Sequence, residues 1–427
     1  MSGGRHFPRA PLRACLAGAL FLAGLAGCAG SPQSSVPAGG AAGGVLPDAR
    51  GKAKLPQGFA DLYSFAGPPN DGATPFGGVA VDKSGNIFGT TYAGGQSSLG
   101  TIFELAPSGS SYTESVLHSY SGADGSLPGA SPFLDVADNV YATATQGGAY
   151  NAGTALELSP SGDTYAETAA YSFGNGSDGS APNGGFVQVG ATLYATTASG
   201  GKYGSGAIVA LSAASLQETD VYDFKNGTDG AYPLSTLAAD ASGALYGTTV
   251  AGGSAKAGTV FKFVPSGKGG SESVIWTFQA KSQNDGASPN SGVVLDAAGN
   301  VYGTTASGGA TLSGVVYRLK PNGAHYAETL LHTFSGGSDG AQPIGGLALI
   351  GKDLYGTTSS GSGSFCLNCG TIFRIKTSGH AYSILHTFGD GDGANPLATL
   401  FATGDAVYGT TSNGGANGFG VVFRYVP

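Results

Sequence analysis

This sequence has few charged residues, and fewer positive than negative ones. Only 11% of the 427 residues are charged, with 19 Lys and Arg against 27 Asp and Glu, and the basic residues form no dense run. Electrostatic capture of nucleic acid or of an anionic membrane surface is therefore excluded, and we expect no nucleic-acid partner. Apolar residues make up 41%, too many for a disordered polyelectrolyte, so the chain should fold.

Methionine and tryptophan occur once each, whereas glycine occurs 77 times beside 21 Phe and 20 Tyr. Glycine loses backbone entropy in a helix, and aromatic residues favour pleated sheet. The composition therefore predicts an all-β protein.

The first 27 residues have the features of an export signal. They contain three arginines, no acidic residue, and an apolar stretch over 14–25 that is too short to span a membrane in the mature protein. They end in Leu25-Ala26-Gly27-Cys28, which resembles a bacterial lipobox. The resemblance implies cleavage before Cys28 and acylation of that cysteine. The alternative is an ordinary secretory signal that is cut near the same place.

Residues 28–54 are mostly Gly, Ala, Ser and Pro, a composition that is typical of a flexible tether. Ala29, and not Asp, follows the cysteine, and the resemblance to Gram-negative lipoproteins then implies transfer to the outer membrane. We therefore expect an exported protein that contacts the membrane through a lipid on Cys28 and carries its folded domain over 55–427.

Two short motifs recur seven times along the folded region. The motif Asp-Gly-X-X-Pro recurs every 51 to 56 residues, and a Tyr-Gly-Thr-Thr motif recurs in step with it. The repeated aspartates are Asp71, Asp124, Asp178, Asp229, Asp285, Asp339 and Asp392. Spacing of this kind is the signature of a repeat architecture.

Each repeat predicts four short strands. In the first repeat they cover 78–82, 87–91, 101–105 and 115–120, all rich in β-branched and aromatic residues and bounded by Gly, Pro, Asn or Ser. Four strands in about 53 residues is the size of a propeller blade.

The ends of the folded region distinguish a closed propeller from an open solenoid. It begins with a lone strand of the fourth type at 61–65 and ends after a strand of the third type at 421–425. The first strand can thus complete the last blade and close the ring, whereas an open solenoid would need polar caps. We predict a seven-bladed β-propeller of four-stranded blades.

The repeated Tyr-Gly-Thr-Thr, the double glycine that follows it, and strands such as Gly258-Thr259-Val260-Phe261 resemble the bacterial GloVer tandem repeats over about 55–427. The resemblance implies an exported, surface-associated protein with no assigned enzymatic activity. The second and third repeats depart from the motif, because Ala142 and Ala195 replace its glycine.

The seven aspartates have two interpretations. Each side chain can accept backbone N–H groups in its own turn, or the seven can form a carboxylate ring that binds a cation. We favour the first, because every repeat shares the residue, and we expect no metal and no cofactor.

Two further sets of polar residues lie on the fourth strands. The histidines His118, His332 and His386 align with Tyr63, Tyr171, Tyr222 and Trp276, so we interpret them as one aromatic position and not as a catalytic triad. The glutamates are expected to be solvated edge charges, without acid and base roles. They are Glu114, Glu167, Glu218, Glu272 and Glu328.

Cys366 and Cys369 interrupt the glycine-rich loop of the sixth repeat. In an oxidising compartment such a pair predicts a local disulfide, since no further zinc ligands and no helix that would activate a thiol lie nearby in the sequence.

The loops between second and third strands vary while the frame repeats, so we expect a ligand on the face that carries them. Their aromatic and amide side chains suit sugars or extended peptides, although ordinary loop packing also explains each aromatic. The candidates are Tyr92, Gln96, Tyr150, Asn151, Tyr203, Phe365, Asn368, Asn417 and Phe419.

The sequence shows no catalytic constellation that breaks the sevenfold pattern. We therefore expect a monomeric, non-enzymatic binding or scaffold protein whose ligand is a glycan or a protein. An exported polysaccharide lyase or hydrolase on a propeller frame is the alternative, and a purely structural surface protein is a third interpretation.

The lipobox resemblance gives the first testable prediction. Cys28→Ser removes the thiol that would be acylated, so the variant should incorporate no labelled fatty acid and should accumulate as precursor or as soluble protein. The measurement is metabolic lipid labelling of cells expressing each form. Equal labelling of parent and variant would refute the anchor.

Overall fold

The computed structural model describes residues 56–162, 164–176, 178–279, 285–361, 369–379 and 381–427. The expected signal peptide, tether and Cys28 lie outside the described residues, as do Phe365, Cys366 and Asn368. The lipid anchor and the disulfide therefore stay predictions. Every regular element in the described residues is a β-strand, which confirms the expected all-β class. No helix among these residues has the length and apolarity to cross a membrane.

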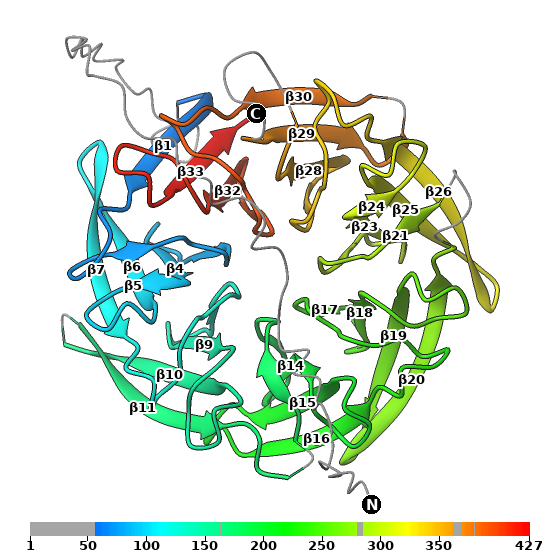
Figure 1. The fold of residues 1–427 in the computed structure, drawn as a ribbon, viewed down its shortest axis with the longest axis horizontal. Coiled ribbons are helices and arrows are strands. Elements are labelled where there is room, and N and C mark those ends of the chain that lie inside the picture. The colour runs from blue at the N-terminus through cyan, green and yellow to red at the C-terminus, as the bar shows by residue number, and fades with distance from the viewer. Residues whose placement is uncertain (1–55, 163, 177, 280–284, 362–368, 380) are drawn as a thin grey trace, which may run out of the picture. The chain divides into compact units, whose positions relative to one another are not determined.

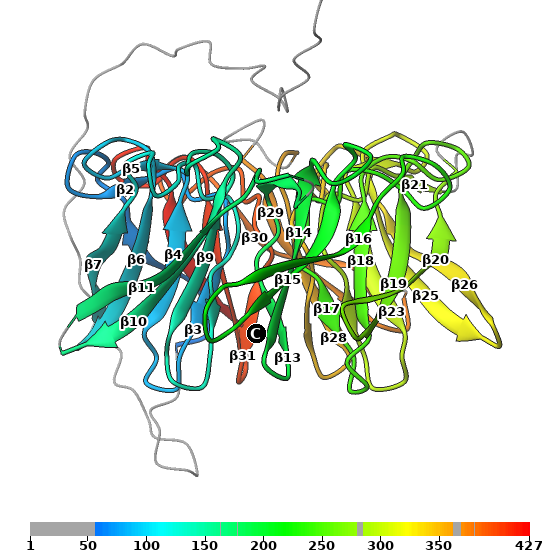
Figure 2. The same ribbon diagram turned by 90° about the horizontal axis from the view of Figure 1, so that it is seen from below.

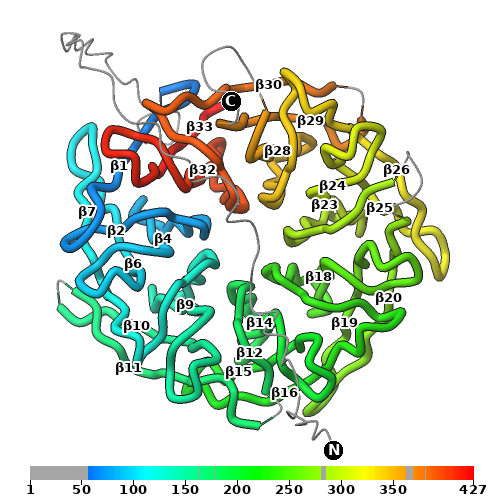
Figure 3. The backbone as a smooth tube through the Cα atoms, in the orientation of Figure 1, coloured from blue at the N-terminus to red at the C-terminus, as the bar shows by residue number. Residues whose placement is uncertain are grey.

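Seven antiparallel sheets surround a central axis as the blades of a β-propeller (Figures 1 and 3). In each blade the strands follow the chain order outward, so that the shortest strand lies innermost and the fourth strand forms the rim. Blade 1 consists of β3 (Val79–Val81), β4 (Ile87–Thr91), β6 (Thr101–Ser108) and β7 (Ser111–Ser119).

The other blades repeat this order. Blade 2 has β8 (Phe133–Leu134), β9 (Val140–Ala144), β10 (Thr154–Ser161) and β11 (Thr164–Ser172). Blade 3 has β13 (Val187–Val189), β14 (Thr192–Ser199), β15 (Ala207–Ser212) and β16 (Glu218–Asp223), with β12 (Ser180–Pro182) also paired to β14. Blade 4 has β17 (Ala238–Ala239), β18 (Leu245–Thr249), β19 (Thr259–Ser266) and β20 (Gly269–Thr277).

Blade 5 has β22 (Val294–Leu295), β23 (Val301–Thr305), β25 (Val315–Asn322) and β26 (His325–Thr333). Blade 6 has β27 (Ala348–Ile350), β28 (Asp353–Thr358), β29 (Thr371–Lys376) and β30 (Ser383–Thr387). Two-stranded pairs join β2 (Gly72–Ala73) to β5 (Ala93–Gly94) and β21 (Gly286–Ala287) to β24 (Ser307–Gly308).

Blade 7 is assembled from both ends of the folded region. Its first three strands are β31 (Phe401–Thr403), β32 (Ala406–Thr411) and β33 (Val421–Val426), and its rim strand is β1 (Gly58–Ser64). Strand β1 pairs antiparallel with β33, which confirms the predicted closure by the N-terminal strand. No strand edge is left open at the junction, so the ring needs no polar cap.

The first threonine of each Tyr-Gly-Thr-Thr motif joins its blade to the next. In six blades its hydroxyl donates to a backbone carbonyl just before the following inner strand, as Thr90 does to Ala130 at 2.7 Å, and Thr410 closes the ring on Gly77 at 2.8 Å. The same bond is made by Thr143, Thr196, Thr248 and Thr304. The equivalent hydroxyl of Thr357 is buried without a hydrogen-bond partner.

Aromatic rings fill the space between blades. At five of the seven junctions the Phe that follows the rim strand meets an aromatic residue on the third strand of the next blade edge to face, with ring centroids 5.1 Å apart for Phe65 and Phe103. Four further junctions repeat the contact, at 5.2 to 5.4 Å. Pairs of this geometry add to the burial of apolar area, so the core lies between the blades.

The glycine of the Tyr-Gly-Thr-Thr motif makes room for that third-strand ring. A Cβ on Gly89 would collide with Cζ of Phe103, its cross-strand partner. In blades 2 and 3, where alanine replaces the glycine, the partners are the smaller Leu156 and Val209. The two departures from the repeat are thus compensated within their own blades.

This pairing gives a prediction for a double-mutant cycle. Gly89→Ala should destabilise the propeller by about 1–3 kcal/mol, because overpacking outweighs the entropy that alanine removes from the unfolded chain. Phe103→Leu alone should also destabilise, by leaving a cavity. The double variant, which copies blade 2, should be more stable than the sum of the single changes by about 0.5–3 kcal/mol.

Denaturant unfolding of all four proteins measures the coupling. Additive free-energy changes would mean that the ring of Phe103 is not the reason for the glycine.

Candidate functional site

One face of the propeller carries all the variable loops. The Asp-Gly turns between blades and the glycine-rich loops between second and third strands lie together on it, and we call it the loop face. In Figure 2 the loop face is the upper edge, where β2, β5 and β21 lie. The hairpins between first and second strands lie on the opposite, lower edge.

The repeated aspartates hold the turns of the loop face. Asp71 accepts the backbone N–H groups of Ala66 and Gly72, each at 2.6 Å. The corresponding turns donate to the other six, through the backbone nitrogens of Ser121, Gly174, Lys225, Gln279, Ser335 and Gly389. These carboxylates are therefore engaged within the turns that carry them.

The residue before each repeated proline adopts a left-handed backbone conformation, which sequence reasoning missed. A residue before proline usually adopts an extended conformation, and a non-glycine residue in the left-handed region is strained. All seven nevertheless have φ between 53° and 59°. They are Thr74, Leu127, Ala181, Tyr232, Ser288, Gln342 and Asn395.

Hydrogen bonds fix the backbone of these seven residues. The N–H of Tyr232 donates to the carbonyl of Ser205 in the loop of the preceding blade (2.9 Å), and its carbonyl accepts from Val250 in its own blade (3.2 Å). The side chains are not part of this frame. In a chain with 77 glycines none of the seven positions is glycine, although glycine would relieve the strain.

On blades 6 and 7 these positions carry amides. Asn395 Nδ2 donates to the carbonyl of Ser359 (3.0 Å), and Asn413 Nδ2 donates to Oδ1 of Asn395 (3.1 Å). Ser359 Oγ donates to the carbonyl of Gln342, and Ser412 Oγ donates to that of Asn395. We call these five residues the amide patch. It links two blades and exposes the side chains of Gln342 and Asn413.

An aromatic pair lies on blade 1, the blade that follows the two carrying the amide patch. The rings of Phe76 and Tyr92 are 4.6 Å apart, tilted by 41°, and half-buried, and burial raises the pKa of Tyr92. The backbone N–H of Thr74 donates to the carbonyl of Phe419 in the loop of blade 7 (2.9 Å). The amide patch and the aromatic pair together form what we call the arc.

The structure spreads the sequence candidates over several blades. Tyr92 belongs to the arc, and Phe419 lies beside it with 38% of its surface exposed. Tyr150 and Tyr203 are 52% and 48% exposed on the loops of blades 2 and 3. Gln96 is exposed on the blade 1 loop.

Two of the amides predicted to bind ligand have bonds within the loops. Asn417 Nδ2 donates to the carbonyl of Phe65 (3.1 Å), and Asn151 Oδ1 accepts from Gly147 (3.2 Å). The residues that the sequence analysis missed are Phe76 and the amide patch. Aligning the repeats could have singled them out, because amides gather there only in the last two repeats.

The rim has a second set of polar contacts, at the seams between neighbouring blades. Tyr171 at the end of blade 2 donates its hydroxyl to Asp178 of the following turn (2.6 Å) and to Glu218 on the rim strand of blade 3 (3.4 Å). The same three positions meet at each seam. An aromatic residue or histidine, a turn aspartate and a residue of the next rim strand thus join each pair of blades.

The expectation that the rim glutamates are solvated edge charges is wrong for four of the five. Burial at the seam, together with the neighbouring aspartate, raises the pKa of Glu114 and Glu218 to about 7. Burial raises the pKa of Glu272 to about 7, and burial next to Asp285 raises that of Glu328 to about 8. Glu167 is exposed. Blade packing, which brings one rim strand against the previous turn, buries these groups.

The three histidines lie in three different seams. His332 stacks on Tyr382 with centroids 3.9 Å apart, and His386 stacks on Phe59 at 3.8 Å. Burial lowers the pKa of both imidazoles. His118 instead has Glu167 as its neighbour across the seam.

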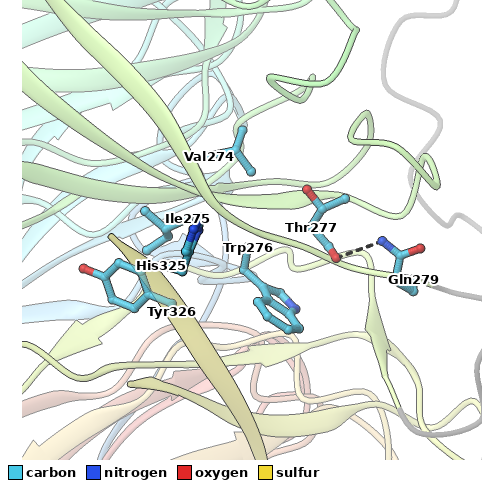
Figure 4. Close-up of a pocket in the computed structure, with 7 residues that line it drawn as sticks. All are labelled: Val274, Ile275, Trp276, Thr277, Gln279, His325 and Tyr326. Atoms are coloured by element: carbon cyan, nitrogen blue, oxygen red, sulfur yellow. Dashed lines mark hydrogen bonds between the residues drawn. The ribbon is translucent and has the colours of Figure 1, made fainter. Parts of the chain in front are cut away.

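An open groove of about 370 Å³ lies on the rim between β20 and β26 (Figure 4). Trp276 and Tyr326 line it, and the indole nitrogen of Trp276 has no hydrogen-bond partner. Gln279 at its edge donates to the carbonyl of Thr277 (3.3 Å). The titratable side chains in its lining are those of His325 and Tyr326.

The seam of Glu328 gives a prediction about pH. Glu328 has a pKa near 8 in the folded protein and about 4.5 when unfolded, so its stabilising contribution is complete below pH 4.5 and is lost as the pH rises toward 8. Glu328→Gln cannot titrate. The variant should therefore gain stability relative to the parent between pH 5 and pH 8, as measured by denaturant unfolding at several pH values. A constant difference across that range would contradict the raised pKa.

Comparison with known proteins identifies the repeat. No curated protein matches the chain. Among solved structures it is similar to a candidate 6-phosphogluconolactonase from Bacteroides uniformis, with 15% identity, a TM-score of 0.48, and coverage of 73% of this chain and 85% of that one. A second candidate 6-phosphogluconolactonase, from Bacteroides fragilis, has 13% identity, a TM-score of 0.43, and coverage of 75% and 85%.

Neither likeness is close enough to support a function. The family model of the Gloeobacter/Verrucomicrobia repeat, in contrast, matches residues 113–292 and 268–427, which confirms the resemblance found in the sequence. The chain belongs to the Gloeobacter/Verrucomicrobia repeat family.

Proposed function

We propose that this protein is a non-enzymatic binding propeller that holds a glycan on the arc of its loop face. The observation that carries the proposal is the contrast between a sevenfold backbone frame and side chains that do not repeat on it. Strain kept at seven positions, none of them glycine, is consistent with selection for the side chains.

The chemistry of the arc favours a polyhydroxylated ligand. The exposed amide of Gln342 offers donors and an acceptor, and Asn413, whose Nδ2 donates within the patch, offers its carbonyl oxygen; these groups match the hydroxyl groups of a sugar. The half-buried rings of Phe76 and Tyr92 offer an apolar surface for the C–H face of a pyranose. None of the arc residues is charged, so an anionic or cationic ligand would find no counter-charge among them.

The runner-up function is that of an exported polysaccharide lyase or hydrolase. Such an enzyme needs an acid and base beside the bound sugar. The glutamates with raised pKa values lie beside turn aspartates at the rim seams and recur around the ring, which is typical of a structural role. The arc itself offers neither group.

The place of action follows from the proposed export. Membership of the repeat family is consistent with an exported protein. With a lipid on Cys28, the propeller would be held at the bacterial membrane, and the outer membrane is the destination that the residue after the cysteine favours. We propose that its ligand is an extracytoplasmic or cell-wall polymer.

The test is a glycan and cell-wall polymer panel applied to residues 55–427, which form a closed compact unit. At least one polymer should bind without being cleaved. The double variant Gln342→Ala and Asn413→Ala should weaken that binding by about tenfold or more, because two hydrogen bonds of about 1 kcal/mol are lost. Both side chains are exposed, so the fold should tolerate the change.

Tyr203→Ala is the matched control, since it removes an equally exposed side chain on blade 3. Binding that depends on Tyr203 and not on the amides would move the site away from the arc. Product formation would overturn the non-enzymatic function, and binding of peptides alone would exclude the glycan.

A further inference from the structure

We propose that the seam between blades 1 and 2 is a binding site for a first-row transition metal ion of the zinc class, held by His118, Asp124 and Glu167. Among the residues that the structure describes, one group of three His, Cys, Asp or Glu side chains brings its ligand atoms within 4.8 Å of one another, and it is this one. The site is independent of the arc.

The ligand atoms are partly positioned already. Nε2 of His118 lies 3.0 Å from Oδ2 of Asp124. Two ligands of a tetrahedral ion with bonds of about 2.1 Å are about 3.4 Å apart, so these two atoms need to separate by only about 0.4 Å to share one ion. The other oxygen of Asp124 accepts from the backbone nitrogen and the hydroxyl of Ser121, both at 2.8 Å. Bonds of this kind orient a ligating carboxylate. The side chain of Glu167 is exposed, so it can rotate and bring its carboxylate closer to His118 and Asp124.

Nε2 of His118 is buried and has no hydrogen-bond partner, because its contact with Asp124 does not have hydrogen-bonding geometry. The Nε2 atom of His386 has the same relation to Asp392 at 2.9 Å, but that seam brings no third ligand among the described residues, so it is Glu167 that makes the seam of His118 suit an ion.

The same seam contains an unpaired buried phenol. Six of the seven rim strands are followed by Phe, whereas the strand of blade 1 is followed by Tyr120. This residue is fully buried, its hydroxyl has no hydrogen-bond partner, and its ring lies 4.9 Å from that of His118. Burial and the carboxylates of Asp124 and Glu167 raise its pKa. Polar groups without partners thus gather at this seam.

The other seams lack one of the three ligand types. His332 and His386 face Tyr382 and Phe59 in place of a glutamate. The seams with Tyr63, Tyr171, Tyr222 and Trp276 have a glutamate but no histidine. One imidazole and two carboxylates suit zinc and its neighbours better than calcium or magnesium. An ion here would join the end of blade 1 to the rim strand of blade 2.

The sevenfold repeat supplies matched variants for the test. His118→Tyr converts the seam into one that the chain already builds with Tyr171, Asp178 and Glu218, so the fold should be kept. Conversely, Tyr171→His should create a second site at the next seam. The untagged unit of residues 55–427 is titrated with Zn²⁺ by calorimetry, and its melting temperature is followed with and without the ion.

We expect one Zn²⁺ per chain for the parent, affinity weakened by at least about tenfold for His118→Tyr, and two ions per chain for Tyr171→His. The ion should raise the melting temperature of the parent more than that of His118→Tyr. No binding, binding unchanged in His118→Tyr, or three ions in the parent would each overturn the proposal.

Discussion

A threonine hydroxyl that bridges one blade to the next, at six of the seven junctions, is the contact on which the spacing of the ring depends. It donates to a backbone carbonyl two or three residues before the neighbouring inner strand, and the bond from Thr410 to Gly77 joins residues 333 positions apart in the chain. Such a bond is buried, so leaving either group unpaired would be costly. Because it fixes the angle between blades, it also determines where the rim strands, the aromatic pairs and the loops must lie.

A rigid frame allows the loop face to vary. The turn aspartates, the left-handed residues before the prolines and the carbonyls that receive their N–H groups repeat with little change. The side chains of the left-handed residues vary from Ala181 to Tyr232, and on blades 6 and 7 they are amides. Rigid scaffolds with variable surface positions are a common basis for recognition, because the ligand does not have to order the site.

The polar contacts at the rim likewise combine positions that repeat in every seam with one position that varies. Each seam combines a ring or imidazole, a carboxylate and a third group, and the third group is an acid in five seams and an aromatic in two. Where the acid is buried its pKa rises, so the proton it keeps takes the place of a counter-charge. Where the third group is aromatic, it stacks on the histidine, as Tyr382 does on His332.

The sequence by itself determined the repeat, the number of blades and the closure, because period, turn residues and the surplus strands at both ends are local properties of the chain. It also contained the exchange of Gly89 and Phe103 for Ala142 and Leu156, although only the cross-strand register showed that these residues meet. The burial of Glu328, the strain before each proline and the gathering of Gln342, Asn395 and Asn413 were decided by tertiary structure. Each of these features depends on groups from neighbouring blades. Packing between blades brings those groups together, and the sequence pattern within a single repeat does not specify that packing.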